Sequence, residues 1–250
     1  MGTLSDIEIE QLALNAWPGL KTYLHGGWVA RWADGYTKRA NSATVLFDAT
    51  PADNKIDWVE AFYRSRSQRP IFRLLSFNQP SLLDERLASA GYQQLDLTQV
   101  MTLDLTQQLD APVSHAQCQI LPIEEWLVIF HELDRSKLGA DDRRLHHALI
   151  KQAAGQLCPM ALFVDGQPAA CGLGVLDAGA IGLFDIVTAE NFRRRGLGGA
   201  LVNSLLAYAD EKGCHTGYLQ VVTKNTAAHR LYVKIGFKNR YQYWYRALAR

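Results

Sequence analysis

Hydrophobic and polar positions in the second half of the chain change period in a regular order. Apolar or strictly alternating runs, which favour strands, follow or precede repeats of three and four residues, which favour helices. The pattern predicts strands over 119–122, 159–164, 169–176, 180–188, 216–223 and 240–248, and helices over 124–134, 141–154, 200–212 and 226–234. Asp165-Gly166, between two of the strands, is typical of a hairpin turn. This order predicts an α/β fold with an α+β mixed sheet.

The first half of the chain repeats part of this order with weaker periodicity. Strands are predicted over 27–33, 44–47, 71–77 and 99–105, helices over 56–66 and 82–90, and a turn at Asp34-Gly35. Between the halves, residues 106–117 are polar and contain a proline, which is typical of a linker. A chain of 250 residues is long enough for two domains, and we predict them over 1–110 and 117–250.

Composition and charge exclude some classes of protein. Hydrophobic residues make up 48% of the chain and charged residues 20%, which is typical of a globular protein with a sizeable core. The net charge of +1 argues against a nucleic-acid partner. The sequence has no run of 18 apolar residues and no signal-peptide pattern. We therefore expect no membrane partner and a cytoplasmic location.

The cysteines and histidines do not form a metal motif. The four cysteines are widely spaced, without a Cys-x-x-Cys pair, and we interpret them as buried reduced thiols. His146 and His147 are neighbours in a predicted helix, where their side chains point about 100° apart. We interpret both histidines as surface residues and expect no metal ion.

A strand, a turn and a helix between residues 180 and 212 form a candidate phosphate site. The first N–H groups of a helix have no internal partner, and the helix dipole makes that end positive. Glycines there let a ligand approach the backbone closely. Arginines at a helix start oppose the dipole unless an anion binds, which favours a ligand site over a solvated helix start. The residues concerned are Arg193, Arg194, Arg195, Gly196, Gly198 and Gly199.

Two motifs in this half resemble the GNAT superfamily, the Gcn5-related N-acetyltransferases. Arg193-x-x-Gly196-x-Gly198 is similar to the family's Arg/Gln-x-x-Gly-x-Gly/Ala turn. Residues 225–237, which read Asn-x-x-Ala-x-x-x-Tyr-x-x-x-Gly-Phe, are similar to a second family segment. The order and separation of the two motifs also fit the family. The resemblance implies the GNAT acyl-CoA N-acyltransferase fold, with acetyl-CoA as co-substrate.

The resemblance also implies which residues bind the coenzyme. In the family the turn holds the pyrophosphate, and the preceding strand leaves backbone groups free for the pantetheine arm. A backbone N–H near Ile186 would polarise the acetyl carbonyl. Asn225 is expected to cap the following helix and to bind the pantetheine arm. The implied coenzyme-binding residues are Ile186, Val187, Thr188, Arg193, Arg194, Arg195, Gly196, Leu197, Gly198, Gly199 and Asn225.

Two residues are candidates for proton transfer. Tyr232 matches the family's general acid, and a tyrosine with an ordinary pKa of about 10 stays protonated at neutral pH. The alternative for Tyr232 is a packed core aromatic. We assign Asp185, the acidic residue within the strand, as general base, against a structural role in holding a neighbouring loop. Strand alternation places Asp185 on the same face as Leu183 and Val187.

The first half looks like a second, degenerate GNAT copy. Its helix at 82–90 ends in a glycine-aromatic pair at 91–92, as the other half does at 236–237. It has Leu87 where the second half has Tyr232, and no arginine-glycine turn precedes its earlier helix. We therefore expect one coenzyme site per chain. An unrelated α+β extension is the alternative.

The acceptor is expected between the halves. Residues 28–42 concentrate aromatic and polar groups. We weigh equally a surface hairpin with its tryptophans packed inward and a substrate-recognition element. In the second case Arg31 and Arg39 would suit a carboxylate or a phosphate on the acceptor.

The resemblance as a whole predicts an acetyl-CoA-dependent N-acetyltransferase. It would transfer an acetyl group to the primary amine of a small molecule or a peptide by direct attack on the thioester. One alternative is a non-catalytic acyl-CoA-binding or interaction protein with a GNAT fold. Another is transfer to oxygen, or transfer of longer acyl groups. A homodimer is left open, and no feature of the sequence identifies the acceptor.

Overall fold

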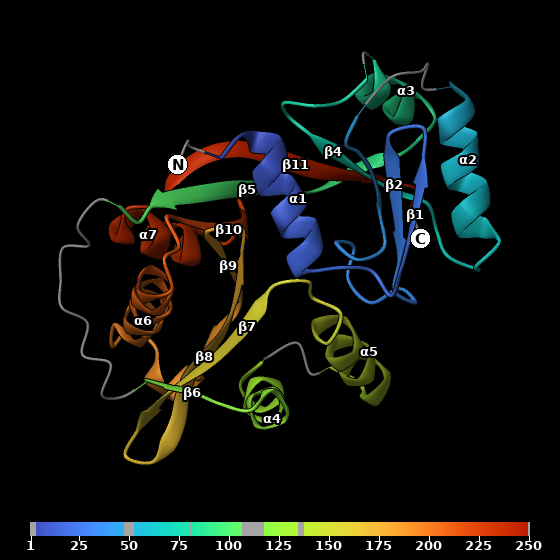
Figure 1. Ribbon diagram of the computed structural model, residues 1–250. Coiled ribbons are helices and arrows are strands. Elements are labelled where there is room, and N and C mark those ends of the chain that lie inside the picture. Colours follow the sequence, from blue (N-terminus) through green and yellow to red (C-terminus); the bar gives the residue numbers. More distant parts are fainter. Residues whose placement is uncertain (1–3, 48–52, 81, 107–117, 135–137, 250) are drawn as a thin grey trace.

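The computed structural model describes residues 4–47, 53–80, 82–106, 118–134 and 138–249. Over these residues, one sheet of eleven strands runs through the molecule in the order β1-β2-β3-β4-β11-β5-β10-β9-β8-β7-β6 (Figure 1). The strands are β1 (Lys21–His25), β2 (Trp28–Trp32), β3 (Ala43–Val45), β4 (Ile71–Leu75), β5 (Gln93–Asp104), β6 (Cys118–Ile120), β7 (Gln156–Val164), β8 (Gln167–Asp177), β9 (Ala180–Thr188), β10 (Thr216–Val222) and β11 (Lys238–Ala247). The helices are α1 (Asp6–Ala16), α2 (Asp53–Arg64), α3 (Leu83–Ser89), α4 (Ile123–Leu133), α5 (Ala140–Ile150), α6 (Leu197–Glu211) and α7 (Thr226–Ile235).

The strand order has an internal twofold pattern. From β1 to β4 the successive pairs are antiparallel, antiparallel and parallel, and from β7 to β10 they are the same. The last strand of each half then crosses to the other half. β5 pairs with β10, β11 pairs with β4, and β5 and β11 pair with each other at the centre of the sheet. Each half is therefore completed by the closing strand of the other half.

The helix before each closing strand ends in the same way. The N–H of Tyr92 donates to the carbonyl of Leu87 at 2.9 Å, and the N–H of Phe237 donates to the carbonyl of Tyr232 at 3.0 Å. The glycine between each pair has a positive φ, 86° in the first half and 113° in the second. This is the left-handed helix ending that glycine favours. Leu87 is therefore the structural counterpart of Tyr232, and the predicted tandem arrangement is confirmed.

The predicted elements of the second half are present, with shifts at their ends. β9 has the predicted bounds, and Asp165 and Gly166 form the hairpin turn with φ of 51° and 75°. α6 begins three residues earlier than predicted, at Leu197, so that its first turn contains the glycines. In the first half, the hydrophobic pattern does not predict α1 or β1. α1 has a recognisable signal, because Ser5 and Glu8 form a capping box at its start.

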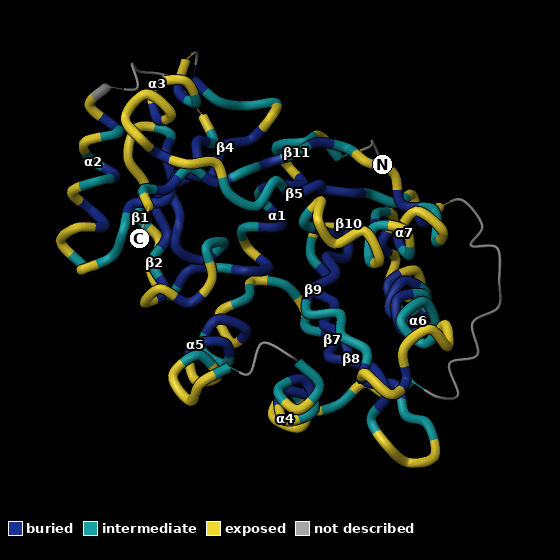
Figure 2. Tube along the Cα trace, turned by 180° about the vertical axis from the view of Figure 1, so that it is seen from behind, coloured by how far each residue is buried: buried dark blue, intermediate teal, exposed yellow. Residues whose placement is uncertain are grey.

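Three buried apolar clusters fill the space between the sheet and the helices. Figure 1 shows α6 and α7 on one side of β9, and α1, α4 and α5 on the other. In Figure 2 the strands are largely buried, whereas the outer helix faces and the turns are exposed. The cluster under α1, α4 and α5 contains Trp17 and Tyr36 of the first half and Trp126 and Phe184 of the second. The two halves therefore share one hydrophobic core.

Candidate active site

The turn from β9 into α6 presents unpaired backbone N–H groups. The N–H of Ala200 donates to the carbonyl of Gly196 at 3.0 Å, which is the first bond of the helix. The N–H groups of residues 197–199 therefore come before the first helical donor and have no acceptor within the helix. Arg194 and Gly196 have φ of 60° and 79°, so the backbone turns sharply just before the helix. A Cβ on Gly198 would lie 3.2 Å from the Thr188 hydroxyl.

A cavity of about 430 Å³ lies over this turn, between β9, α6 and α7. It brings together most of the residues predicted to bind the coenzyme. They are Ile186, Thr188, Arg193, Arg194, Gly196, Leu197, Gly198 and Gly199, joined by Tyr232. Arg193 also donates from Nε to the carbonyl of Thr188 at 3.2 Å, and the Arg195 guanidinium lies 5.2 Å from the centre of the Phe192 ring. These contacts attach two of the three arginines to the turn.

β9 and β10 pair over only part of their length. The parallel register runs from the pair Ala180 and Thr216 to the pair Leu183 and Leu219. β9 continues to Thr188 beyond the last pair, and the matching part of β10 pairs with β5 on its other side. The two strands therefore separate at the end that faces the turn. This is the geometry expected for backbone groups that accept an added extended chain.

Tyr232 lies on α7, across the cavity from the turn, and Asn225 is the N-cap residue of α7. Tyr232 is 7% exposed and stacks edge-to-face on Phe237. Burial raises the pKa of Tyr232 to about 12, which keeps its hydroxyl protonated at neutral pH. The Asn225 side chain accepts a hydrogen bond from the N–H of Ala228 at 3.2 Å, so its capping role is confirmed. Its predicted contact with the pantetheine arm stays a prediction.

The orientation predicted for Asp185 is wrong, because β9 has a bulge at this residue. Asp185 has a φ of 49°, and the β8–β9 register shifts between Cys171 and Leu173. Alternation breaks at such a bulge. Leu183 packs in the cluster under α6, whereas Val187 packs against the cluster under α4 and α5. These two side chains therefore lie on opposite faces.

His146 is fully buried, which corrects its interpretation as a surface residue. It lies on the inner face of α5 with Leu145, Leu149 and Ile150. The spacing of three and four residues between His146, Leu149 and Ile150 is typical of the buried face of a helix. Its Nε2 lies 2.9 Å from Oδ2 of Asp185, and its Nδ1 lies 3.0 Å from Nε2 of His131.

Aromatic side chains surround the His146 ring. The rings of Trp17, Tyr36, Trp126 and Phe130 all pack around His146. His147, on the outer side of the same helix, is partly exposed and contacts Glu124.

His131 lines a second cavity, of about 730 Å³, at the end of α4. Burial, followed by the neighbouring His146, lowers the pKa of His131 below its ordinary value. The cavity also takes in the start of the turn after β9. Its charged and polar lining comprises Glu132, Asp134, Arg143, Glu190 and Asn191.

The segment 28–42 contains both a buried strand and a loop that reaches the second half. Trp28 is buried in β2. The buried Arg31 donates to the carbonyls of Trp17 and Arg39, so its guanidinium holds two loops of the first half together. The Arg39 guanidinium lies 5.8 Å from the centre of the Phe184 ring, beside Asp185 on β9.

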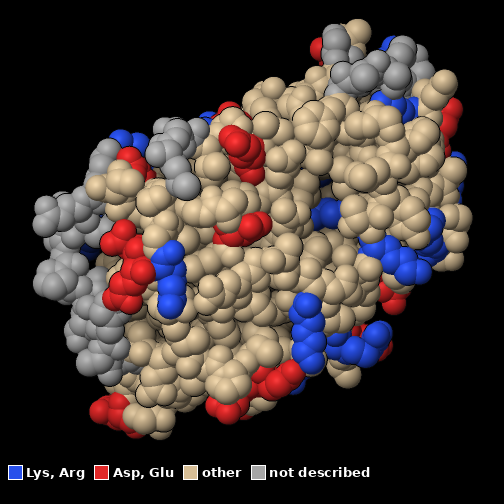
Figure 3. All heavy atoms as spheres, viewed as in Figure 1, with Lys and Arg blue, Asp and Glu red and all other residues tan. Residues whose placement is uncertain are grey.

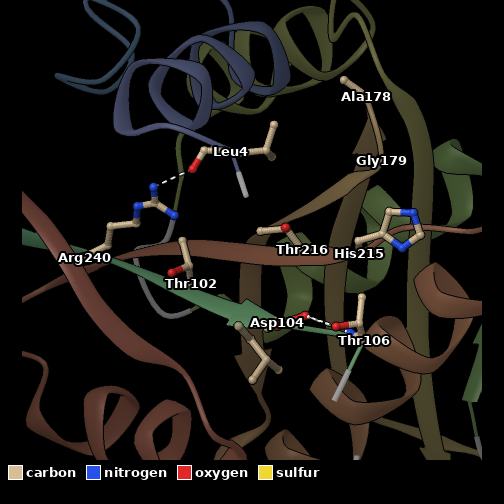
Figure 4. A pocket seen from close by; sticks show the side chains of 10 residues that line it. Leu4, Thr102, Asp104, Thr106, Ala178, Gly179, His215, Thr216 and Arg240 are labelled. Atoms are coloured by element: carbon tan, nitrogen blue, oxygen red, sulfur yellow. Dashed lines mark hydrogen bonds between the residues drawn. The ribbon is translucent and has the colours of Figure 1, made fainter. Parts of the chain in front are cut away.

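A third cavity, of about 470 Å³, lies at the opposite end of β9 and β10 (Figure 4). Arg240 lines this cavity and donates hydrogen bonds to Asp6 and to the carbonyl of Leu4. Asp104 accepts from the hydroxyl of Thr106 at 2.6 Å. None of the predicted site residues lines this cavity.

Several features bear on other classes of site. In the described ranges, no group of three or more His, Cys, Asp or Glu side chains could hold a metal ion. The four cysteines are free, and only Cys118 is not buried. No helix in the described part of the chain is long and apolar enough to cross a membrane. Acidic and basic side chains are interspersed on the face shown in Figure 3.

Comparison with known proteins gives consistent matches over nearly the whole chain. A family model described as "Probable histone acetyltransferase Rv0428c C-terminal" matches residues 5–246. The N-acetyltransferase YobR of Bacillus subtilis, described as uncharacterized, is 29% identical over 248 residues, which cover 96% of this chain and 97% of YobR.

Solved structures share the fold. A GCN5-related N-acetyltransferase from Kribbella flavida has a TM-score of 0.71 at 14% identity, covering 98% of this chain and 95% of its own. A tandem GNAT protein from the clavulanic acid biosynthesis pathway has a TM-score of 0.60 at 16% identity, covering 84% and 76% of the two chains.

Proposed function

Because this chain belongs to the Rv0428c C-terminal acetyltransferase family of the GNAT superfamily, we propose that it transfers the acetyl group of acetyl-CoA to a primary amine. The acceptor would be a small molecule or a peptide. The observation that carries the proposal is the cavity at the start of α6, which joins the glycine turn, the separated end of β9 and Tyr232.

In this proposal the coenzyme binds along the turn and the end of β9. The pyrophosphate accepts hydrogen bonds from the N–H groups of residues 197–199, where the helix dipole favours an anion. Arg193, Arg194 and Arg195 add charge-assisted bonds to the phosphates. The pantetheine arm pairs with the backbone of residues 186–188, on the side that β10 leaves free. The N–H of Ile186 polarises the acetyl carbonyl.

The reaction forms one bond and breaks one. The amine nitrogen attacks the thioester carbon, a C–N bond forms, and the C–S bond breaks. A primary ammonium sheds two protons on the way to an amide. One goes to a base, and Tyr232 gives its own proton to the leaving thiolate and regains it from the second. The raised pKa of Tyr232 keeps it in the acid form that this step needs.

Asp185 remains the acidic group that we propose for the base function. Its carboxylate lies next to Ile186 in the chain and contacts Nε2 of His146 at 2.9 Å. The two residues therefore form one proton-accepting unit. The structural alternative is a buried contact that only attaches α5 to β9.

A thiol-release assay with acetyl-CoA and a panel of amines tests the proposed function. We expect release of coenzyme A that depends on both substrates, and a mass increase of one acetyl group on the nitrogen of the acceptor. Binding of acetyl-CoA without turnover across the whole panel would instead favour a non-catalytic acyl-CoA-binding protein. Acetyl groups found on oxygen, or turnover with longer acyl donors alone, would favour the other transfer reactions.

A further inference from the structure

Three titratable side chains form a hydrogen-bonded chain on the α5 side of β9. Asp185 contacts Nε2 of His146 at 2.9 Å, and Nδ1 of His146 contacts Nε2 of His131 at 3.0 Å. His146 in the middle is fully buried, and the Asp185 side chain is 20% exposed. At the far end, His131 lines the cavity of about 730 Å³ beside α4. The chain therefore joins the centre of β9 to a solvent-accessible space.

Hydrogen-bonding rules fix the direction of both bonds while Asp185 is ionised. A carboxylate only accepts, so Nε2 of His146 must carry the proton that faces it. In a neutral imidazole the other nitrogen is then an acceptor, so Nδ1 of His146 accepts from the Nε2–H of His131. This leaves Nδ1 of His131 without a proton. The ring nitrogen that can take up a proton is therefore Nδ1 of His131, at the cavity end of the hydrogen-bonded series.

The cavity has the chemistry to receive an ammonium group. Of the described residues that line it, Glu132, Asp134 and Glu190 carry carboxylates and Arg143 carries a positive charge. It is also adjacent to the coenzyme cavity. Residues 189–191 line the His131 cavity, and the next residues of the turn, Phe192 and Arg193, line the coenzyme cavity. Successive residues of the same turn therefore line the two cavities.

We infer that the acceptor binds as an ammonium in this cavity and that His131 takes its proton, with His146 and Asp185 as positioning residues behind it. Nδ1 of His131 accepts the ammonium proton, and the Nε2 proton of His131 moves to Nδ1 of His146. The positive charge then lies on His146, against the Asp185 carboxylate. After the product leaves, the protons move back and Nδ1 of His131 gives its proton to water. This inference rests on the proposed acetyl transfer and moves the proton-accepting atom from Asp185, the base proposed above, to His131.

The charged surroundings predict a characteristic pH profile. His146 faces Asp185 from β9, His131 from α4 and the Tyr36 ring from the first half. His131 is influenced by His146, Arg143, Asp134 and Asp185, and burial with His146 lowers its pKa. The base works as the neutral imidazole. We therefore expect kcat/KM to rise with pH through a pKa below the ordinary histidine value of about 6.5.

The test compares the His131→Ala variant with the wild-type protein in the thiol-release assay. Loss of the base should lower kcat/KM roughly 100-fold or more, remove the rise at low pH and leave acetyl-CoA binding unchanged. Because His131 lines an open cavity, added imidazole should restore activity to His131→Ala in proportion to its neutral fraction. His147→Ala, on the outer side of α5, is the matched control and should keep its rate and its pH profile.

A second pair of variants separates the base from a structural role. His131→Gln keeps a hydrogen-bonding side chain but cannot carry the proton, so it should be as inactive as His131→Ala while folding normally. Asp185→Asn should lower the rate and shift the remaining pH limb to lower pH, because the protonated form of the histidine pair loses the carboxylate that stabilises it. Full activity in His131→Gln, or a loss in His131→Ala without change of pH profile and without imidazole rescue, would overturn the inference. An inactive wild-type chain that still binds acetyl-CoA would instead contradict the proposed function.

Discussion

Tyr232 combines a buried ring with a place on the wall of the coenzyme cavity. The packed core aromatic and the general acid, which were alternatives in the sequence, are therefore compatible in the structure. Burial holds the ring in one place and raises the pKa of the hydroxyl to about 12. The first effect fixes the position of the proton donor, and the second keeps the hydroxyl protonated at neutral pH.

We expect Tyr232→Phe to lower kcat by roughly 10- to 1000-fold, because the variant keeps the ring but loses the proton. The dissociation constant for acetyl-CoA should stay nearly unchanged. With the raised pKa, wild-type activity should not decline near pH 10, where an ordinary tyrosine ionises, but nearer to pH 12. Steady-state kinetics and calorimetric titration measure these quantities. Tyr208→Phe, on the outer part of α6, is the control, and equal turnover in the two variants would remove Tyr232 from the mechanism.

Among single residues, the sequence predicts those whose role depends on their spacing along the chain. The arginine-glycine turn and Tyr232 are such residues, and the structure gathers them around one cavity. The surroundings of Asp185 could not be predicted in this way. One residue with a positive φ reverses the faces of β9, and alternation carries no signal for it. The burial of His146 follows from its place on the apolar face of α5, where Leu149 and Ile150 lie three and four residues further along.

In the proposed function, coenzyme binding depends on the first turn of α6. Two of the three residues before the first helical N–H donor are glycines, and a Cβ on Gly198 would already lie 3.2 Å from the Thr188 hydroxyl. A larger side chain at this position would extend toward the cavity that Gly198 and Thr188 line together.

We therefore expect Gly198→Val to raise the dissociation constant for acetyl-CoA by about tenfold or more, with little loss of stability. Titration of the protein with acetyl-CoA measures the first effect and thermal unfolding the second. Gly139→Ala is a control at the start of α5, where, among the described residues, a Cβ would meet Asp142 at 3.9 Å. Unchanged affinity in Gly198→Val would show that the coenzyme does not use this turn.

Elements were predictable where the period is strong and local. β7 to β10, α6 and α7 have continuous apolar strands or a clear helical period, and their bounds shift by only a few residues. β1 is an edge strand whose residues are mostly exposed, so it lacks the alternation that marks a half-buried strand. The full length of β5 was also underestimated, because its first residues, Gln93 and Gln94, are polar and exposed.

At the scale of the whole molecule, the exchange of closing strands makes the halves interdependent. β11 lies between β4 and β5, and β5 lies between β11 and β10. The sequence predicted two similar halves in tandem but not this exchange. Strand pairing between residues more than a hundred positions apart leaves no periodic signal in the chain.

A chain that ends after residue 237 lacks β11 and leaves β4 and β5 without their shared partner. We expect this variant to lose the cooperative thermal unfolding transition of the whole protein, first half included. Circular dichroism recorded during heating measures this unfolding transition. A chain that ends after residue 248 keeps β11 and should unfold like the wild type. A separate, unchanged transition of the first half in the shorter chain would contradict the interdependence.

The crossed strands also bear on why a copy without the coenzyme turn persists. In architecture the two halves are arranged like two subunits that exchange their closing strands within one polypeptide. Under the proposed function, a mutation that removes catalytic residues from the first copy leaves its closing strand in place, and the sheet of the second copy still includes that strand. We therefore expect selection to keep the first copy as a scaffold for the second.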